Sequence, residues 1–197
     1  MNTTSASAAE LERKKYSKIW AIDQYRRVSP GERDLSHFLK EASPLEGDSI
    51  TDIGCGTGRA AIQLQAAGFK VTATDICPTA PDPAMSGHYN IPFICAALWE
   101  LVALRTDWIY CVDVMEHIPE NFVDRSLKSM AKITKKGGYI QIALFDDTCF
   151  GNLIKDKLHL TLETSAWWEN KIEKYWKINK MYHDKMWARF FVGESII

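Results

Sequence analysis

Residues 51–59, TDIGCGTGR, decide how the rest of this chain folds. A β-prone run, residues 48–53, leads into three glycines at alternate positions, and an Ala- and Leu-rich helical pattern follows them. This order predicts a strand, a tight loop and a helix. Glycine allows positive φ and close approach of a ligand to the backbone, and a helix N-terminus favours carboxylate or phosphate oxygens. We therefore expect a ligand-binding loop here.

The spacing of the glycines separates two classes of cofactor. A dinucleotide fingerprint needs G-x-G-x-x-G, whereas here the third glycine comes one residue early and Arg59 stands where that pattern expects glycine. The loop instead resembles motif I of the class I S-adenosylmethionine-dependent methyltransferases, in which an acid precedes a G-x-G-x-G loop by two positions. Asp52 fills that position. The resemblance implies a single α/β domain with a Rossmann-like doubly wound sheet, mostly parallel with an antiparallel C-terminal hairpin strand, and S-adenosylmethionine as cofactor.

A second stretch, DWIYCVDVMEHIPE at residues 107–120, resembles motif IV of the same superfamily. There a buried strand ends in a D-V-x-E-H-I-P turn, and ligands bind such sheets at the carboxyl ends of the strands. The resemblance therefore places Val112, Asp113, Glu116 and His117 beside the transferable methyl group. The two motifs occur in the expected order, with Asp52 in the first and Asp113 in the second.

The adenosine half of the cofactor is expected near the next two strands, residues 69–76 and 91–95. Asp75 follows Gly56 at close to the separation at which a βαβ unit presents a carboxylate to ribose hydroxyls. The alternative is an acid that merely ends a strand. Many family members carry an acid for the adenine amine after the following strand, but this chain has Ala96 there. We expect backbone groups near residues 97–98 to hold adenine and Trp99 to fill the core.

The predicted site combines these positions with one residue of the N-terminal segment. The expected cofactor contacts are Arg26, Asp52, Gly54, Cys55, Gly56, Gly58, Asp75, Ile76, Ala97, Leu98, Val112 and Asp113. His117 is the candidate general base, because an unperturbed imidazole titrates near neutrality. Alternatively the Glu-His pair shapes the turn and no base is needed, since positioning alone supplies about 7–11 kcal/mol in favourable intramolecular reactions. Glu116 and Asp113 are then structural or cofactor-facing.

The N-terminal residues 1–28 are predicted to form a tail and a lid helix, and residues 29–197 the methyltransferase domain. Residues 1–10 read as a frayed terminus and residues 11–25 as a helix. The resemblance implies that Trp20, Tyr25 and Arg26 close the pocket, Arg26 by pairing with the methionine carboxylate. The alternative places both aromatic rings in the core and Arg26 in solvent.

The remaining elements follow from periodicity and breaker residues. Ser29-Pro30 predicts the start of a helix, with others over 59–67 and 119–136, the latter ending on Lys135, Lys136 and Gly137. Residues 77–90 carry several helix breakers and predict at most a short helix. We expect a strand over 138–145, a helix capped by Ser165, and a closing hairpin over 181–192.

Two groups near the C-terminal half are candidates for acceptor contacts. Asp146 and Asp147 follow the predicted strand and either face a cationic substrate or are solvated loop acids. The H-L-T segment before a W-W helix resembles small-molecule or glycan methyltransferases, which implies contacts from His159 and Thr161. A loop histidine satisfied by its neighbours is the alternative.

The composition of the chain limits the classes of partner that it is expected to bind. The chain has 197 residues, a net charge of −1 and a pI of about 6.5, so no global basic field favours a nucleic-acid backbone. The five cysteines form no C-x-x-C pair and have no histidine at ligand spacing, which predicts free thiols in a reducing cytoplasm and no metal. No apolar run approaches the roughly 20 residues that a membrane-spanning helix needs, so no membrane span is expected.

These observations predict methyl transfer from S-adenosylmethionine to a small soluble acceptor, an O- or N-methylation by in-line displacement. A non-catalytic S-adenosylmethionine-binding partner module is one alternative. A nucleic-acid methyltransferase is another, although base-methylating forms carry N-P-P-Y or D-P-P-Y where this chain has VDVM. The sequence carries no signal for the identity of the acceptor or the oligomeric state.

Overall fold

A single twisted sheet organises the computed structural model, which describes residues 4–102, 104–147 and 149–197. In this part of the chain the strand order is β3-β2-β1-β4-β5-β7-β6. Strands β1 to β5 are parallel, and β7 runs antiparallel to both β5 and β6. The strands are β1 (Ser49–Ile53), β2 (Lys70–Asp75), β3 (Phe93–Cys95), β4 (Thr106–Val112), β5 (Thr134–Ala143), β6 (Trp176–His183) and β7 (Trp187–Ser195). The order reverses between β1 and β4, where open α/β sheets form a ligand crevice.

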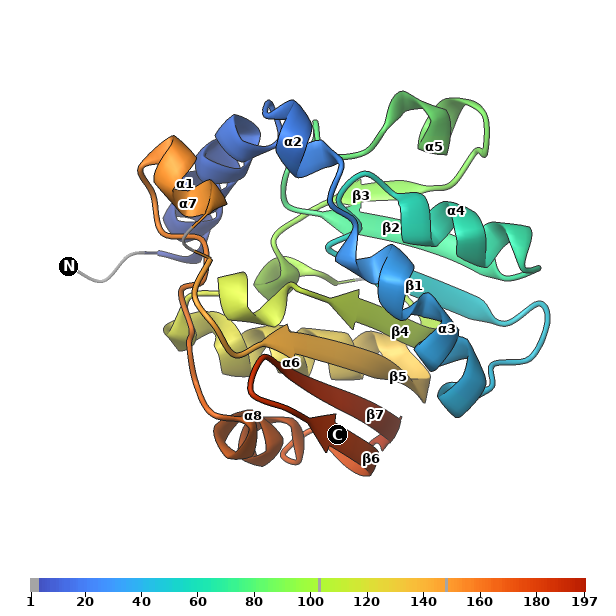
Figure 1. The fold of residues 1–197 in the computed structure, drawn as a ribbon. Coiled ribbons are helices and arrows are strands. Elements are labelled where there is room, and N and C mark those ends of the chain that lie inside the picture. Colours follow the sequence, from blue (N-terminus) through green and yellow to red (C-terminus); the bar gives the residue numbers. More distant parts are fainter. Residues whose placement is uncertain (1–3, 103, 148) are drawn as a thin grey trace.

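Helices cover both faces of this sheet (Figure 1). The helices are α1 (Ser5–Ile19), α2 (Asp23–Arg26), α3 (Pro30–Ala42), α4 (Arg59–Ala66), α5 (Pro83–Gly87), α6 (Glu120–Ile133), α7 (Phe150–Ile154) and α8 (Ser165–Ile172), with 3₁₀ turns η1 (Leu98–Glu100) and η2 (Met115–His117). Helices α3 and α4 pack on one face, and α6 and α8 on the other. Helices α1, α2 and α7 lie beyond the carboxyl ends of the strands, over the crevice. None of the described helices has the length and apolar composition needed to cross a membrane.

The N-terminal segment is more ordered than predicted. Helix α1 already begins at Ser5, because the hydroxyl of Thr4 accepts a hydrogen bond from the Ser7 amide at 3.3 Å. Ala8 and Ala9 are buried in the main core, where small side chains allow the helix to approach closely. The predicted frayed end was therefore wrong from Ser5 onward, and residues 1–3 lie outside the described part. The predicted helix over 11–25 is divided between α1 and α2.

The central elements are largely confirmed. Helices α3 and α4 occupy the predicted ranges, and Gly68 follows α4 with a φ of +94°. The breaker-rich segment 77–90 holds only the short α5, and the hairpin of β6 and β7 closes the sheet as expected.

Two boundaries were predicted wrongly. Helix α6 ends at Ile133, and Lys135 and Lys136 belong to β5 rather than to a last helical turn. Gly137 is a strand residue at a close approach, since a Cβ there would lie 2.2 Å from the Val192 carbonyl oxygen. The cap of α8 is Thr164, whose hydroxyl accepts from the Trp167 amide at 3.2 Å, and not Ser165.

Candidate functional site

The loop after β1 has a shape that only glycine permits at two positions. Gly54 and Gly56 have φ values of +65° and +53°. A Cβ on Gly54 would lie 2.4 Å from a methyl carbon of Val114, and one on Gly56 would lie 2.8 Å from the Trp20 ring. Both glycines line cavities at the carboxyl edge of the sheet. The loop therefore presents bare backbone to whatever occupies those cavities.

Asp75 joins this loop to the end of β2. Its carboxylate accepts hydrogen bonds from the Gly56 amide at 3.0 Å and from the Cys77 amide at 2.9 Å. The side chain is buried yet borders a cavity, and burial raises its pKa to about 6. A carboxylate held by two amides has its direction fixed before a ligand arrives.

Asp52 is a second buried acid at this edge. Its Oδ2 atom has no hydrogen-bond partner among the described residues. Burial, reinforced by the negative charge of Asp75, raises the pKa of Asp52 to about 8. A ligand that carries hydrogen-bond donors or positive charge would therefore stabilise the ionised forms of Asp52 and Asp75.

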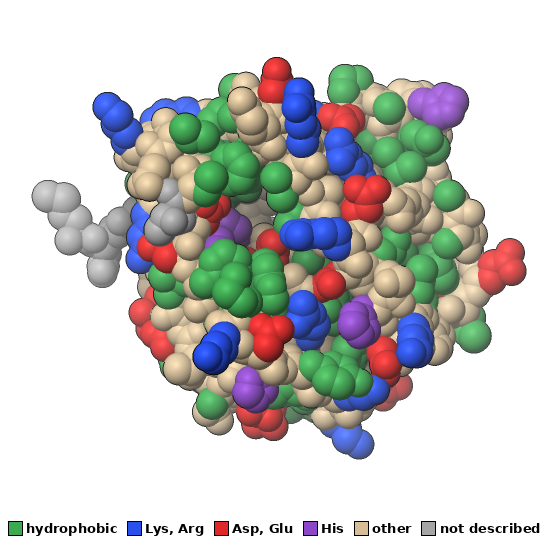
Figure 2. Space-filling view, in the orientation of Figure 1, with side chains coloured by type: hydrophobic (Ala, Val, Ile, Leu, Met, Phe, Trp, Pro, Cys, Tyr) green, Lys and Arg blue, Asp and Glu red, His purple; other side chains and the backbone are tan. Residues whose placement is uncertain are grey.

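Two neighbouring cavities with shared lining residues lie between this edge and the helices above it. The inner cavity is bordered by Tyr16, Asp75, Ile76, Leu98 and Trp99, among other residues. The outer cavity is bordered by Arg33, Cys55, Phe145, Phe150, His159 and Trp187, among others. Trp20, Tyr25, Gly54, Asp113 and His117 border both. Figure 2 shows the hollow on this face of the molecule, with hydrophobic, acidic and histidine side chains at its rim.

Most predicted cofactor contacts border these cavities. The residues concerned are Asp52, Gly54, Cys55, Gly56, Asp75, Ile76, Leu98, Val112 and Asp113. Gly58 instead packs on Met85, and Ala97 is fully buried. Trp99 fills the core as expected, since it stacks on Phe122 with ring centroids 4.7 Å apart, and it also borders the inner cavity.

Arg26 has a different environment from the one predicted. Its guanidinium pairs with the carboxylate of Asp82 and donates to the Thr79 carbonyl at 3.0 Å, so it joins α2 to the segment before α5. It is partly exposed and borders neither cavity. Arg33, which sequence reasoning missed, borders the outer cavity from α3 with an exposed side chain.

The helices above the cleft contribute unsatisfied donors. The Tyr16 hydroxyl and the Trp20 indole N–H are buried without a partner in the described part of the chain. Trp20 and Tyr25 meet edge to face with centroids 4.7 Å apart, and both border the two cavities. Tyr16 was missed in the sequence, although it lies four residues before Trp20 on the same face of the helix.

Asp113 lies at the centre of the crevice with a strained backbone. Its φ is +55°, a conformation that non-glycine residues adopt at a cost and that concentrates at functional sites. The carboxylate accepts from the Gln141 side-chain amide at 3.2 Å, and burial raises its pKa to about 7. The turn after β4 therefore holds one acid at the junction of both cavities.

His117 does not have the near-neutral pKa on which its predicted role depended. Burial, and then the neighbouring His159, lower the pKa of His117 to about 3. Its Nδ1 atom lies 3.1 Å from the Leu158 carbonyl oxygen. A group of such low basicity is a poor acceptor for a proton at neutral pH.

The other predicted acceptor contacts divide between cavity and scaffold. His159 and Asp147 border the outer cavity, and Asp147 also accepts from the Cys149 and Phe150 amides at the start of α7. Asp146 borders neither of the two cavities. Thr161 is buried and donates to the Ile118 carbonyl at 2.7 Å, so its role is structural.

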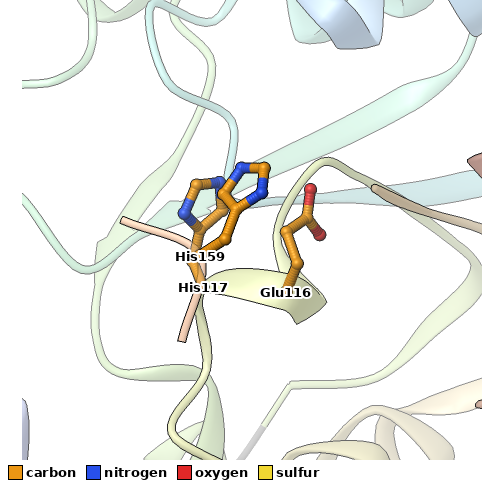
Figure 3. A group of neighbouring side chains, drawn as sticks. All are labelled: Glu116, His117 and His159. Carbon is orange, nitrogen blue, oxygen red and sulfur yellow. The ribbon is translucent and has the colours of Figure 1, made fainter. Parts of the chain in front are cut away.

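Glu116, His117 and His159 form a cluster that was not predicted. Ligating atoms of Glu116, His117 and His159 all lie within 4.8 Å of one another (Figure 3). The prediction of no metal considered only the cysteines and their neighbours, and it did not consider residues that the fold brings together from different segments.

The comparison with known families decides the class of this fold. The family model described as a methyltransferase domain matches residues 22–193. The chain belongs to this methyltransferase-domain family. Its matched region includes the glycine loop, Asp75, the turn after β4 and the segment that carries His159.

Characterised relatives of this methyltransferase domain match it over part of their length. The ubiquinone biosynthesis O-methyltransferase of Rickettsia akari is 30% identical over 122 residues, which cover 59% of this chain and 47% of the relative. The chloroplastic magnesium protoporphyrin IX methyltransferase of Arabidopsis thaliana is 30% identical over 105 residues, covering 50% of this chain and 34% of the relative. The chain thus spans about half or less of the length of these relatives.

A solved structure reproduces the fold at low sequence identity. The 1,6-didemethyltoxoflavin-N1-methyltransferase of Burkholderia thailandensis, solved with its acceptor and S-adenosylhomocysteine, matches with a TM-score of 0.73 at 13% identity. The match covers 97% of this chain and 90% of that protein. The sheet and its helical layers are therefore those of a Rossmann-like methyltransferase, as the glycine loop and the turn after β4 predicted.

Proposed function

We propose that this methyltransferase domain binds S-adenosylmethionine across the inner cavity and the glycine loop, and transfers its methyl group to a small acceptor in the outer cavity. The observation that carries this proposal is the buried Asp75, which is hydrogen-bonded to the Gly56 amide while bordering the inner cavity. The loop and the carboxylate form one preorganised unit at the topological switch point of the sheet.

The residues present suit this cofactor. Asp75 is positioned to accept from vicinal ribose hydroxyls, and Ile76, Leu98 and Trp99 offer apolar and aromatic surface to an adenine ring. Gly54 and Gly56 leave room against the backbone that a Cβ would fill. The unpartnered Asp52 oxygen and the Tyr16 and Trp20 donors lie at buried positions where a polar ligand gains hydrogen bonds.

The chain's own contribution to the reaction is positioning. When bound, S-adenosylmethionine supplies a methyl group already activated by a positively charged sulfonium. Trp20, Tyr25 and His117 border both cavities, so they enclose the junction, exclude water and restrict the approach of the acceptor. No strong base is required of His117 in this scheme.

The outer cavity favours a small acceptor with a planar apolar part. Phe145, Phe150 and Trp187 supply aromatic surface, and the exposed Arg33 supplies positive charge at the border. The relatives' names describe O-methylation in ubiquinone biosynthesis and the toxoflavin enzyme N-methylation, so oxygen and nitrogen acceptors are both in scope. A nucleic-acid partner is disfavoured by the net charge of −1.

Two further expectations remain part of this proposal. The helices within residues 1–28 act as a lid, since Tyr16, Trp20 and Tyr25 border the cavities from that side. A cytoplasmic location follows from the five cysteines without disulfide spacing.

Calorimetry with S-adenosylmethionine and S-adenosylhomocysteine tests the cofactor. We expect binding by the wild type and an affinity at least about tenfold weaker for Asp75→Ala, a loss of about 1.4 kcal/mol or more. Glu194→Ala, an exposed acid on β7, is the matched control and should bind as the wild type does. No binding by folded wild-type protein would remove the proposal.

Transfer itself needs a second experiment. Labelled methyl groups from S-adenosylmethionine should appear in small-molecule fractions incubated with the wild type, and should be strongly reduced with Asp75→Ala at cofactor concentrations near the wild-type dissociation constant. The [4+2]-cyclase SpnF has the same fold, with a TM-score of 0.64 and 13% identity, so the fold alone does not specify methyl transfer. Cofactor binding without transfer to any fraction would favour a non-catalytic binding module.

A further inference from the structure

Glu116 has a carboxylate that the protein itself does not satisfy. The residue is 0% exposed, and neither of its side-chain oxygens has a hydrogen-bond partner among the described residues. Burying a carboxylate without a partner is costly, so buried acids are normally paired, hydrogen-bonded or bound to a metal. The backbone amides of Glu116 and Ala143 favour the ionised carboxylate, but neither satisfies one of its oxygens within hydrogen-bond distance.

Two histidines lie beside Glu116, and each has one ring nitrogen at a backbone carbonyl. Nδ1 of His117 faces the Leu158 carbonyl oxygen and Nδ1 of His159 faces the Phe145 carbonyl oxygen. A carbonyl only accepts, so each neutral ring carries its proton on Nδ1 and leaves Nε2 free as an acceptor or ligand. This arrangement, with the second nitrogen donating to a backbone carbonyl, is the usual orientation of metal-binding histidines.

The backbone holds the cluster together although its members are far apart in sequence. The Leu160 and Thr161 amides donate to the Glu116 carbonyl oxygen at 2.7 and 3.0 Å, and the Thr161 hydroxyl donates to Ile118. The segment carrying His159 is thus fixed to the turn that carries Glu116 and His117. Figure 3 shows the carboxylate and both imidazoles close together, two of them on η2 and one on the neighbouring segment.

We propose that Glu116, His117 and His159 bind one divalent transition-metal ion of the Zn²⁺ type, with an open coordination position toward the outer cavity. Two imidazoles and one carboxylate form a ligand set typical of catalytic zinc and non-haem iron sites, whereas Mg²⁺ prefers oxygen ligands. The ligating atoms lie within 4.8 Å, and an ion held about 2.1 Å from each would draw them closer by side-chain rotation.

The open position gives this site a role in the proposed reaction, and this part rests on the proposed function. His117 and His159 both border the outer cavity, so an acceptor hydroxyl there would reach the ion. Coordination lowers the pKa of a hydroxyl, whose proton passes to water in the cleft while the oxygen stays bound to the ion as a nucleophile. The acceptor class would then be a hydroxyl compound rather than an amine.

Metal titration without cofactor or acceptor tests the site directly. We expect one Zn²⁺ or Co²⁺ per chain by calorimetry, with visible absorption bands of a four- or five-coordinate Co²⁺ complex. Glu116→Gln and His159→Ala should each weaken binding by at least ~100-fold, since even outer-sphere changes cost about 10–100-fold. His183→Ala, an exposed histidine on the hairpin, is the control and should bind as the wild type does.

Thermal unfolding provides a second readout. Glu116→Gln replaces the buried carboxyl group by an uncharged amide of nearly the same size, so this variant should unfold close to the wild-type temperature without metal. Added Zn²⁺ should then raise the unfolding temperature of the wild type and not that of the variant. Equal zinc responses in the wild type, Glu116→Gln and His159→Ala would overturn the proposal. Cofactor binding, measured through Asp75, is independent of this outcome and distinguishes the two failures.

Discussion

The two halves of the crevice are built in different ways. On the cofactor side, the glycine loop and Asp75 come from one βαβ unit and are joined by backbone amides. On the acceptor side, His117, His159 and Phe145 come from separate segments and meet only in the folded chain. The first half is a local property of the sequence, and the second is a property of the tertiary structure.

The largest expected effect concerns the local half. Gly54→Ala introduces a Cβ within 2.4 Å of Val114 at a φ of +65°, so the loop must move away from the sheet edge. We expect a loss of cofactor affinity of at least ~100-fold by calorimetry, or roughly 2.7 kcal/mol. Gly47→Ala is the matched control, because its φ is +84° but nothing lies within 4 Å of its Cβ. Equal losses in both variants would attribute the effect to backbone strain alone.

The second effect is a pH dependence of stability from Asp75. Its pKa rises from 3.8 to about 6 on folding, because of burial, so the folded state binds the proton more tightly than the unfolded state. This stabilisation is fully present below the unfolded pKa and is lost as pH rises through about 6. The free energy of unfolding without ligand should fall by about 3 kcal/mol over this window.

Asp75→Asn should remove that part of the pH dependence, as denaturant unfolding at pH 4 and pH 8 would show. Cofactor binding should follow the opposite trend in the wild type, strengthening as the carboxylate ionises to accept from ribose hydroxyls. A wild-type curve with the same slope as the variant's would contradict the assignment of the titration to Asp75.

A smaller effect is expected from the proposed lid. Trp20→Ala removes the ring that lies over Gly56 and a buried indole donor, without opening the core of the sheet. We expect cofactor affinity to fall about tenfold, or roughly 1.4 kcal/mol. Trp167→Ala on α8, away from both cavities, should leave affinity unchanged. An unaltered dissociation constant in Trp20→Ala would place the lid outside the cofactor site.

The smallest effect is expected at Arg26. Because its guanidinium is paired with Asp82, Arg26→Ala should lower stability by about 1 kcal/mol or less and change cofactor affinity less than about threefold. Asp82→Asn breaks the same pair from the other side and should match it in stability. A much larger affinity loss in Arg26→Ala alone would restore the predicted pairing with the methionine carboxylate.

Features set by a short stretch of sequence were predicted correctly, whereas features that depend on contacts between distant segments were not. The loop at Gly54 to Gly58 and the turn at Asp113 were recognised because each is a short pattern with a fixed backbone consequence. The end of α6 was missed because Lys135 and Lys136 fit a basic last turn as well as a strand, and the pairing of Thr134 and Gly137 with β4 on either side of them decides for the strand. The same holds for Ser5 to Glu10, where burial against the core outweighs a polar composition.

The site was predictable only where its chemistry is local. The depressed pKa of His117 depends on burial beneath α1 and on the neighbouring His159, which belongs to a distant segment of the sequence. The ion pair of Arg26 was not predicted, because its partner, Asp82, lies in a segment that the sequence describes only as irregular. Clusters formed by distant segments become visible once the strand order is known.

The hydrogen bonds from Leu160 and Thr161 to the turn after β4 also bear on how such enzymes diversify. They fix residues 158–161 at one point, while residues 144–147 and 149–157 lie between β5 and that point outside the sheet. These residues also pack on the N-terminal helices, since the Phe150 ring meets Tyr25 with centroids 5.1 Å apart and Lys15 donates to the Lys157 carbonyl. Replacements there would therefore reshape the wall of the outer cavity and move the helices above it at the same time.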